Sequence, residues 1–148
     1  MNDQVEIEIY RALNLEKQKY TYFLLTAAGA GIILAINQTK GVGLDLSQIP
    51  LALGVLSWGA SFYSGCCGVS LVQSLLFSNI ELIKVQKGVH PNVGEDQSKV
   101  IEISEIIRKA MDSQSDKSQA FLDWQFKLLI IGGLFYITWH VFEMSLIG

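Results

Sequence analysis

The sequence predicts an all-α fold: a three-transmembrane-helix membrane protein whose long helices extend into a cytoplasmic helical hairpin. Half of the 148 residues are hydrophobic and only 17% are charged. In soluble domains about a quarter of all residues are charged. The apolar residues also gather in three runs, each long enough to cross a bilayer core of about 30 Å as a helix. Finally, the basic residues are distributed unevenly between the segments that flank these runs.

The predicted spans lie at 20–38, 49–77 and 126–147 within one membrane domain, 1–148. A helix needs about 20 mostly apolar residues to cross a membrane. Apart from Lys127 at the edge of the third run, the only charged residue in the three runs is Glu143. Three buried helices of a soluble bundle are the alternative. The runs argue against it, because they lack the polar face that a soluble helix keeps toward water.

The orientation follows from the basic residues. Three spans place the N-terminal segment and the middle loop on the same side of the membrane. The N-terminal segment has three basic residues, the first loop has only Lys40, and the middle loop with its flank has seven, which are Lys84, Lys87, Lys99, Arg108, Lys109, Lys117 and Lys127. Because basic loops stay inside, we expect the N-terminus and the middle loop to be cytoplasmic. The C-terminus is then outside the inner (plasma) membrane.

The segment 1–19 is predicted to be a cytoplasmic amphipathic helix. Val5, Ile9, Ala12 and Leu13 fall on one helical face among charged residues. The helix either runs into the first span or lies along the membrane surface. A cleavable signal peptide would begin with a short, net-positive segment. This segment is mixed in charge, so we expect the first span to be retained.

The segment 78–125 is predicted to be the cytoplasmic helical hairpin. The helix of the second span continues to about Lys87, where Gly88 suits a helix end. The residues 90–94 (His-Pro-Asn-Val-Gly) suit a turn. A further helix is expected to begin near 96–98, with Ser98 as its N-cap.

This last helix carries apolar residues at heptad spacing, which is typical of a coiled-coil seam. The expected seam has a polar interruption at Gln114 and Lys117 and consists of Val100, Ile103, Ile107, Ala110, Gln114, Lys117, Phe121 and Trp124. The stretch 112–118 (Asp-Ser-Gln-Ser-Asp-Lys-Ser) is the weakest helical sequence, and it is either a break or part of one helix of ~50 residues.

A line of small residues in the second span is the main candidate site. Its members share roughly a third of the helix circumference and are Gly54, Ser57, Ser61, Ser64, Gly65 and Gly68. Small residues let helices approach closely in lipid, and serine hydrogen-bonds across an interface. The line is therefore either a helix-packing or a pore-lining surface. Ser70, Ser74 and Ser78 form a second, rotated polar line, so we expect a homo-oligomer with more than one contact surface.

Two further groups are candidate sites. His140 and Glu143 are one helical turn apart in the third span, and an ionisable residue inside a membrane suggests function. One possibility is that they form a polar pair, which either relays protons or makes a hydrogen bond to another helix. The other is that both side chains simply lie near the outer headgroups. Cys66 and Cys67 are adjacent, and soft ligands of this kind bind Cu(I). With few histidines and no second cysteine pair, we expect no metal site.

No glycine-rich phosphate loop, nucleophile elbow or paired carboxylates occur in the sequence. We therefore expect no enzyme and no cofactor, and the net charge of −3 argues against a nucleic-acid partner.

The leading hypothesis is a homo-oligomer that forms a pore or alters membrane permeability, which by layout alone resembles a bacterial effector. The alternative is a non-conducting accessory or scaffold subunit, whose hairpin docks a cytoplasmic protein partner. A small carrier or metal transporter ranks below both, because polar groups at the bilayer midplane are sparse.

Overall fold

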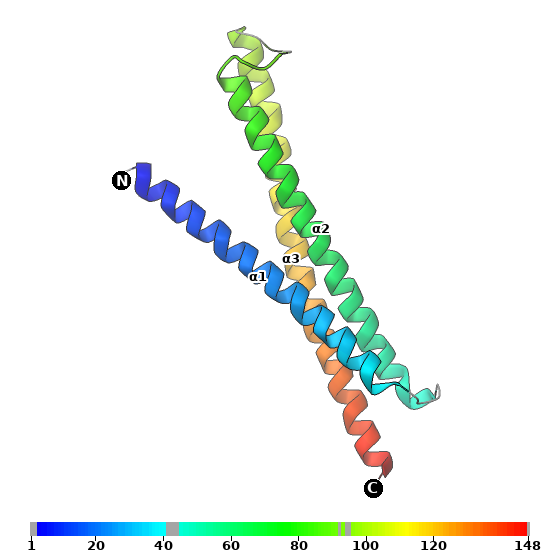
Figure 1. Cartoon of the computed structure of the whole chain (residues 1–148). Coiled ribbons are helices and arrows are strands. Elements are labelled where there is room, and N and C mark those ends of the chain that lie inside the picture. Colours follow the sequence, from blue (N-terminus) through cyan, green and yellow to red (C-terminus); the bar gives the residue numbers. More distant parts are fainter. Residues whose placement is uncertain (1–2, 41–44, 92, 94–95, 148) are drawn as a thin grey trace. The chain divides into compact units, whose positions relative to one another are not determined.

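The computed structural model describes residues 3–40, 45–91, 93 and 96–147, and within them it describes only the backbone of 3–7, 10, 146 and 147. This part of the chain folds into three long α-helices, α1 (Asp3–Gln38), α2 (Ile49–Gln86) and α3 (Gln97–Ile147), with one 3₁₀ turn at Leu46–Gln48 (Figure 1). Each of the three helices contains a stretch that is long and apolar enough to cross a membrane. The predicted all-helical chain with three candidate spans is thus confirmed.

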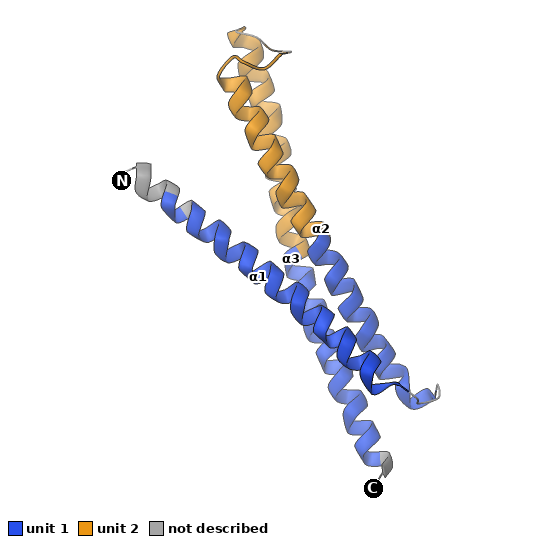
Figure 2. Cartoon of the chain, in the orientation of Figure 1, with its two compact units in different colours: residues 1–66, 122–148 blue, residues 67–121 orange. Residues whose placement is uncertain are grey.

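The chain divides into two compact units, which Figure 2 shows in different colours. The first unit contains residues 1–66 and 122–148, and the second contains residues 67–121. Helix α2 passes from the first unit to the second between Cys66 and Cys67, and α3 returns between Phe121 and Leu122. The second unit is a helical hairpin made of the last part of α2 and the first part of α3.

Helix α1 is continuous from Asp3 to Gln38. The amphipathic N-terminal segment therefore runs directly into the first apolar run, which was the first of the two predicted alternatives. Near the junction, Lys19 Nζ lies 2.9 Å from Glu16 Oε1 on the exposed surface of the helix. An exposed pair at this spacing adds only a few tenths of a kcal/mol, ~0.3–0.5, so the helix depends mainly on its other contacts.

The end of α2 confirms the prediction at Gly88. This glycine has φ 68, a left-handed conformation that is strained for residues with a Cβ. The Gly88 N–H donates to Val85 O at 3.0 Å, and the Val89 N–H donates to Lys84 O at 3.1 Å. These two bonds form a Schellman motif, which ends a helix by satisfying its last carbonyls. In the following turn the Val93 N–H donates to His90 O, while positions 92 and 94 lie outside the described residues.

The start of α3 corrects one prediction. Asp96, not Ser98, caps the helix, because its Oδ1 accepts a hydrogen bond from the Ser98 N–H at 3.1 Å. The Asp96 carbonyl also accepts from the Val100 N–H at 2.9 Å, which is the first intrahelical bond. Ser98 is thus already within the first turn, and the cap preference of aspartate explains the choice. The stretch 112–118 is helical throughout, so α3 has no break there.

The predicted seam of α3 is wrong at three of its positions. Ala110, Lys117 and Trp124 are exposed, whereas Ser118 and Gln125 are buried. At the last two of these positions the seam thus lies one residue later, at Ser118 and Gln125. The physical reason is close helix packing: a lysine or a tryptophan between the two helices would hold them apart, whereas serine permits close approach.

The core of the first unit is built around Trp58. Its buried members are Ala35, Leu51, Trp58 and Trp139, and the partly buried residues packed against them are Ile32, Val55, Leu129 and Tyr136. All three helices contribute to this cluster, so it ties α1 to the α2–α3 pair within this unit.

The indole of Trp58 lies between two glycines from different helices. A Cβ on Gly31 of α1 would come within 2.8 Å of Trp58 Cδ2, and a Cβ on Gly132 of α3 would come within 2.5 Å of Trp58 Cδ1. Trp58 Nε1 donates a hydrogen bond to Leu129 O at 3.2 Å. The large ring therefore fits only because both flanking positions lack side chains.

Candidate functional site

The predicted line of small residues on α2 faces the interior of the protein. Gly54, Ser61, Ser64, Gly65 and Gly68 are buried, and Ser57 is half-buried. We call these six residues the small-residue stripe. Their burial shows that other parts of the chain cover most of the stripe.

The covering atoms belong mainly to α3. In the first unit, a Cβ on Gly54 would lie 3.1 Å from Gly132 O, and a Cβ on Gly65 would meet both Gln125 of α3 and Leu25 of α1. In the second unit, a Cβ on Gly68 would lie 3.7 Å from Phe121 Cβ. This placement fits the packing hypothesis. A pore lined by the stripe stays a prediction, and it would require α3 to move away.

The two serines nearest Trp58 differ in what they contact. Ser61 Oγ is fully buried and donates to Gln125 O of α3 at 2.7 Å. Ser57 Oγ instead donates to Leu53 O of its own helix at 2.8 Å. Of these two hydroxyls, that of Ser61 joins two helices and that of Ser57 stays within α2.

We predict that Ser61→Ala lowers the free energy of unfolding by about 1 kcal/mol, the usual net value of a hydrogen bond, because α2 and α3 lose a direct bond. Ser57→Ala is the matched control, and its effect should stay within ~0.5 kcal/mol. Detergent-mediated unfolding followed by circular dichroism measures both. Equal losses for the two variants would contradict the assigned role of Ser61.

Gln125 is the residue of the stripe region that sequence reasoning missed. Its side chain is 0% exposed, and neither Oε1 nor Nε2 has a hydrogen-bond partner among the described residues. A buried unsatisfied polar group costs about 1–3 kcal/mol. The sequence contains one indication, because Gln125 lies seven residues after Ser118 and so on the same helical face. This spacing is recognisable only when the seam is known to pass through these two residues.

The predicted pair of His140 and Glu143 is not joined in the structure. Within the described part of the chain, no hydrogen bond or ion pair connects the two side chains. The His140 ring instead stacks on Tyr136, with 6.5 Å between ring centroids and an interplanar angle of 2°. Tyr136 Oη in turn donates to Gln38 Oε1 of α1 at 2.9 Å. A proton relay through His140 and Glu143 stays a prediction, with no direct contact to support it.

A groove lies on the surface of the second unit, with a volume of about 580 Å³. Polar and small side chains of α2 line it together with apolar residues of α3, and the full set is Ser70, Gln73, Ser74, Phe77, Ser78, Glu81, Ile106, Ile107 and Ala110. The groove contains the whole second polar line that the sequence indicated. Phe77 is 71% exposed and Ile106 is 59% exposed, so the described residues leave most of both side chains uncovered.

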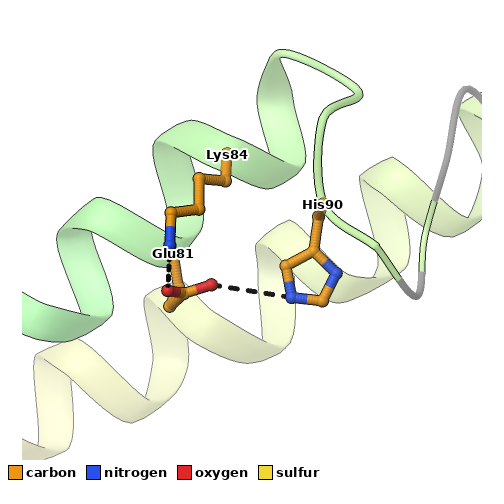
Figure 3. A network of polar contacts seen from close by, with 3 residues as sticks. All are labelled: Glu81, Lys84 and His90. Atoms are coloured by element: carbon orange, nitrogen blue, oxygen red, sulfur yellow. Dashed lines mark hydrogen bonds and ion pairs between the residues drawn. The ribbon is translucent and has the colours of Figure 1, made fainter.

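A small polar network lies at the end of α2, beyond the predicted span 49–77. Figure 3 shows Lys84 and His90 on either side of the Glu81 carboxylate. Lys84 Nζ lies 2.7 Å from Oε1, and His90 Nε2 lies 3.6 Å from Oε2. The hydrogen bond from Lys84 lowers the pKa of Glu81, while partial burial opposes this effect. Glu81 therefore stays ionised at neutral pH, and its carboxylate lies between Lys84 of the helix and His90 of the turn.

Metal ligands do not gather in the described part of the chain. Cys66 is exposed, Cys67 is half-buried, and both are free thiols. Among the described residues, no group of three or more His, Cys, Asp or Glu side chains is close enough to hold a metal ion.

Comparisons with protein-family models, curated proteins and solved structures found no match to this chain.

Proposed function

We propose that this chain is a non-conducting accessory subunit in a membrane. It docks a protein partner through the groove of its second unit. The contrast between the two small-residue surfaces of α2 supports this proposal. The small-residue stripe is covered by α3 and α1 of the same chain, whereas the groove around Ser74 is bordered by the exposed side chains of Phe77 and Ile106. An apolar groove with a few polar groups is the usual form of a binding surface.

The proposed placement in the membrane rests on helix length and charge. At 1.5 Å per residue, the 38 residues of α2 extend about 57 Å, well beyond a bilayer core of about 30 Å. The second unit carries six of the eleven basic residues, namely Lys84, Lys87, Lys99, Arg108, Lys109 and Lys117. The rule that basic segments stay inside therefore assigns residues 78–125 and the N-terminus to the cytoplasm and the C-terminus to the outside of the inner membrane. Four residues of the groove lie in the predicted span 49–77, so the groove begins at the cytoplasmic end of this span; they are Ser70, Gln73, Ser74 and Phe77.

A homo-oligomer that forms a pore is the second candidate function. One observation favours it: the unpartnered amide of Gln125 is buried against Gly65 of the small-residue stripe. A pore would give this amide a hydrated surface if α3 moved away from α2. Because this requires the packed interface to open, the accessory role is the proposal that the geometry supports better.

Ion flux separates the two functions. We expect purified protein in liposomes to show no flux above that of empty liposomes, whatever its oligomeric state. A flux that disappears in Ser57→Leu while assembly is unchanged would instead favour a lined pore, because Ser57 is the half-buried member of the stripe. Ser57→Ala is the control, since it removes the hydroxyl without adding bulk.

Docking is tested by site-specific photo-crosslinking in cells. We expect a crosslinker at Ser74, which lines the groove, to form a discrete adduct with another protein, and the Ile106→Asp substitution to abolish that adduct. The matched control is a crosslinker at Leu76, which is exposed but does not line the groove. Equal labelling from 74 and 76 would contradict docking in the groove. An adduct of two copies of this chain would assign the surface to self-association instead.

A further inference from the structure

The junction of the three helices in the first unit contains a polar side chain that packing alone does not explain. Gln125 of α3 and Ser61 of α2 are both 0% exposed. The Gln125 amide is directed at Gly65, because a Cβ on Gly65 would lie 2.8 Å from Gln125 Cδ. Leu25 of α1 closes the same position, with its Cδ2 2.7 Å from that Cβ. The amide thus lies at the small-residue stripe, enclosed by all three helices.

The amide has more hydrogen-bonding capacity than the surrounding residues satisfy. A glutamine side chain offers two N–H donors and one carbonyl acceptor, and neither of its polar atoms has a partner in the described part of the chain. Ser61 Oγ donates to the Gln125 backbone carbonyl, so the hydroxyl keeps lone pairs that can accept another bond. The donors and the acceptor of the Gln125 amide therefore remain available, while Ser61 Oγ retains only the capacity to accept.

From the unsatisfied amide we propose that Gln125 and Ser61 bind an internal water molecule at the junction of the three helices. Buried waters in proteins bridge polar groups that lack other partners, typically with about three hydrogen bonds. The Gln125 amide donates to or accepts from this water, and the Ser61 hydroxyl accepts from it. The first unit therefore has a hydrated position between apolar helix faces.

The test is nuclear magnetic resonance of the full chain in detergent micelles, with glutamine side chains labelled with ¹⁵N. The expected result is a cross-peak between the Gln125 NH₂ group and long-lived bound water. The Gln125→Met variant assigns the signal, because it removes the amide and keeps the length of the side chain. Gln86 is the internal control, since its exposed side chain should show only rapidly exchanging water.

Glycine variants locate the water. Gly65→Ala places a methyl group at the junction and should abolish the cross-peak. Gly59→Ala is the matched control on the same helix and should keep it, because a Cβ on Gly59 meets nothing within 4 Å. A wild-type protein without the cross-peak overturns the proposal, and so does a folded Gly65→Ala variant that retains it. If Gly65→Ala does not fold, Ser61→Ala decides: a lost or weakened cross-peak supports the site, and an unchanged one overturns it.

Discussion

Trp58→Ala should lower the free energy of unfolding by about 3–5 kcal/mol, the range for replacing a buried tryptophan by alanine. The ring is 6% exposed and occupies the space between Gly31 and Gly132. Its removal leaves a cavity in the centre of the first unit, since two glycines have no side chains with which to fill it. The Leu129 carbonyl also loses the hydrogen bond from the indole N–H.

The measurement is the midpoint of unfolding in detergent, followed by helical circular dichroism. Trp124→Ala is the matched control, because the Trp124 ring is 57% exposed and has Lys127 Nζ at 5.5 Å from its centroid. A cation–π contact at an exposed site contributes about 0.5–1 kcal/mol, so this variant should lose no more than that. Similar losses in the two variants would show that Trp58 does not organise the core.

Gly132→Ala should be the second most damaging single change among those considered, with a loss of about 1–3 kcal/mol from overpacking. The new Cβ would lie 2.5 Å from Trp58 Cδ1 and 3.0 Å from Gly54 O. The second of these atoms is backbone, so relief requires α2 and α3 to move apart. That movement would also weaken the contacts of Trp58 with Tyr136, whose ring centroids are 5.8 Å apart.

The neighbouring Gly133 is the control for this change. A Cβ on Gly133 meets nothing within 4 Å, and alanine is a better helix former than glycine by about 1 kcal/mol. Gly133→Ala should therefore leave the midpoint of unfolding unchanged or raise it. If Gly132→Ala also raised the midpoint, the close packing of α3 against Trp58 would be contradicted.

The helices were predictable because their signals are local. The three apolar runs, Gly88 at the end of α2 and the polar residues near the start of α3 each act within a few residues of chain. Backbone hydrogen bonds must be satisfied within the helix wherever lipid replaces water, so long apolar runs leave little choice of structure. The cap at Asp96 was missed by two residues, because Asp96 and Ser98 are both good N-caps and only the observed hydrogen bonds distinguish them.

The candidate site was only partly predictable from the sequence. The small-residue stripe was recognisable from its 3.6-residue period, but the sequence does not say what faces each member. The distinction between Ser57 and Ser61 depends on α3, where the partner Gln125 is 64 residues away from Ser61 along the chain. The positions of Gln125 and Trp58 depend on the same pairing of α2 with α3. A buried amide and a large buried ring each need a specific neighbour on the opposite helix.

The sequence by itself thus determined that this chain forms three long helices with apolar stretches of membrane-spanning length, because composition and period act along a single helix. The tertiary structure alone decided which faces of those helices meet. It moved the seam of α3 from Lys117 and Trp124 to Ser118 and Gln125, and it placed Trp58 between two glycines. The physical reason is that close packing is a property of pairs of surfaces, and the fit of a ring or an amide depends on side chains that are absent from the opposite helix.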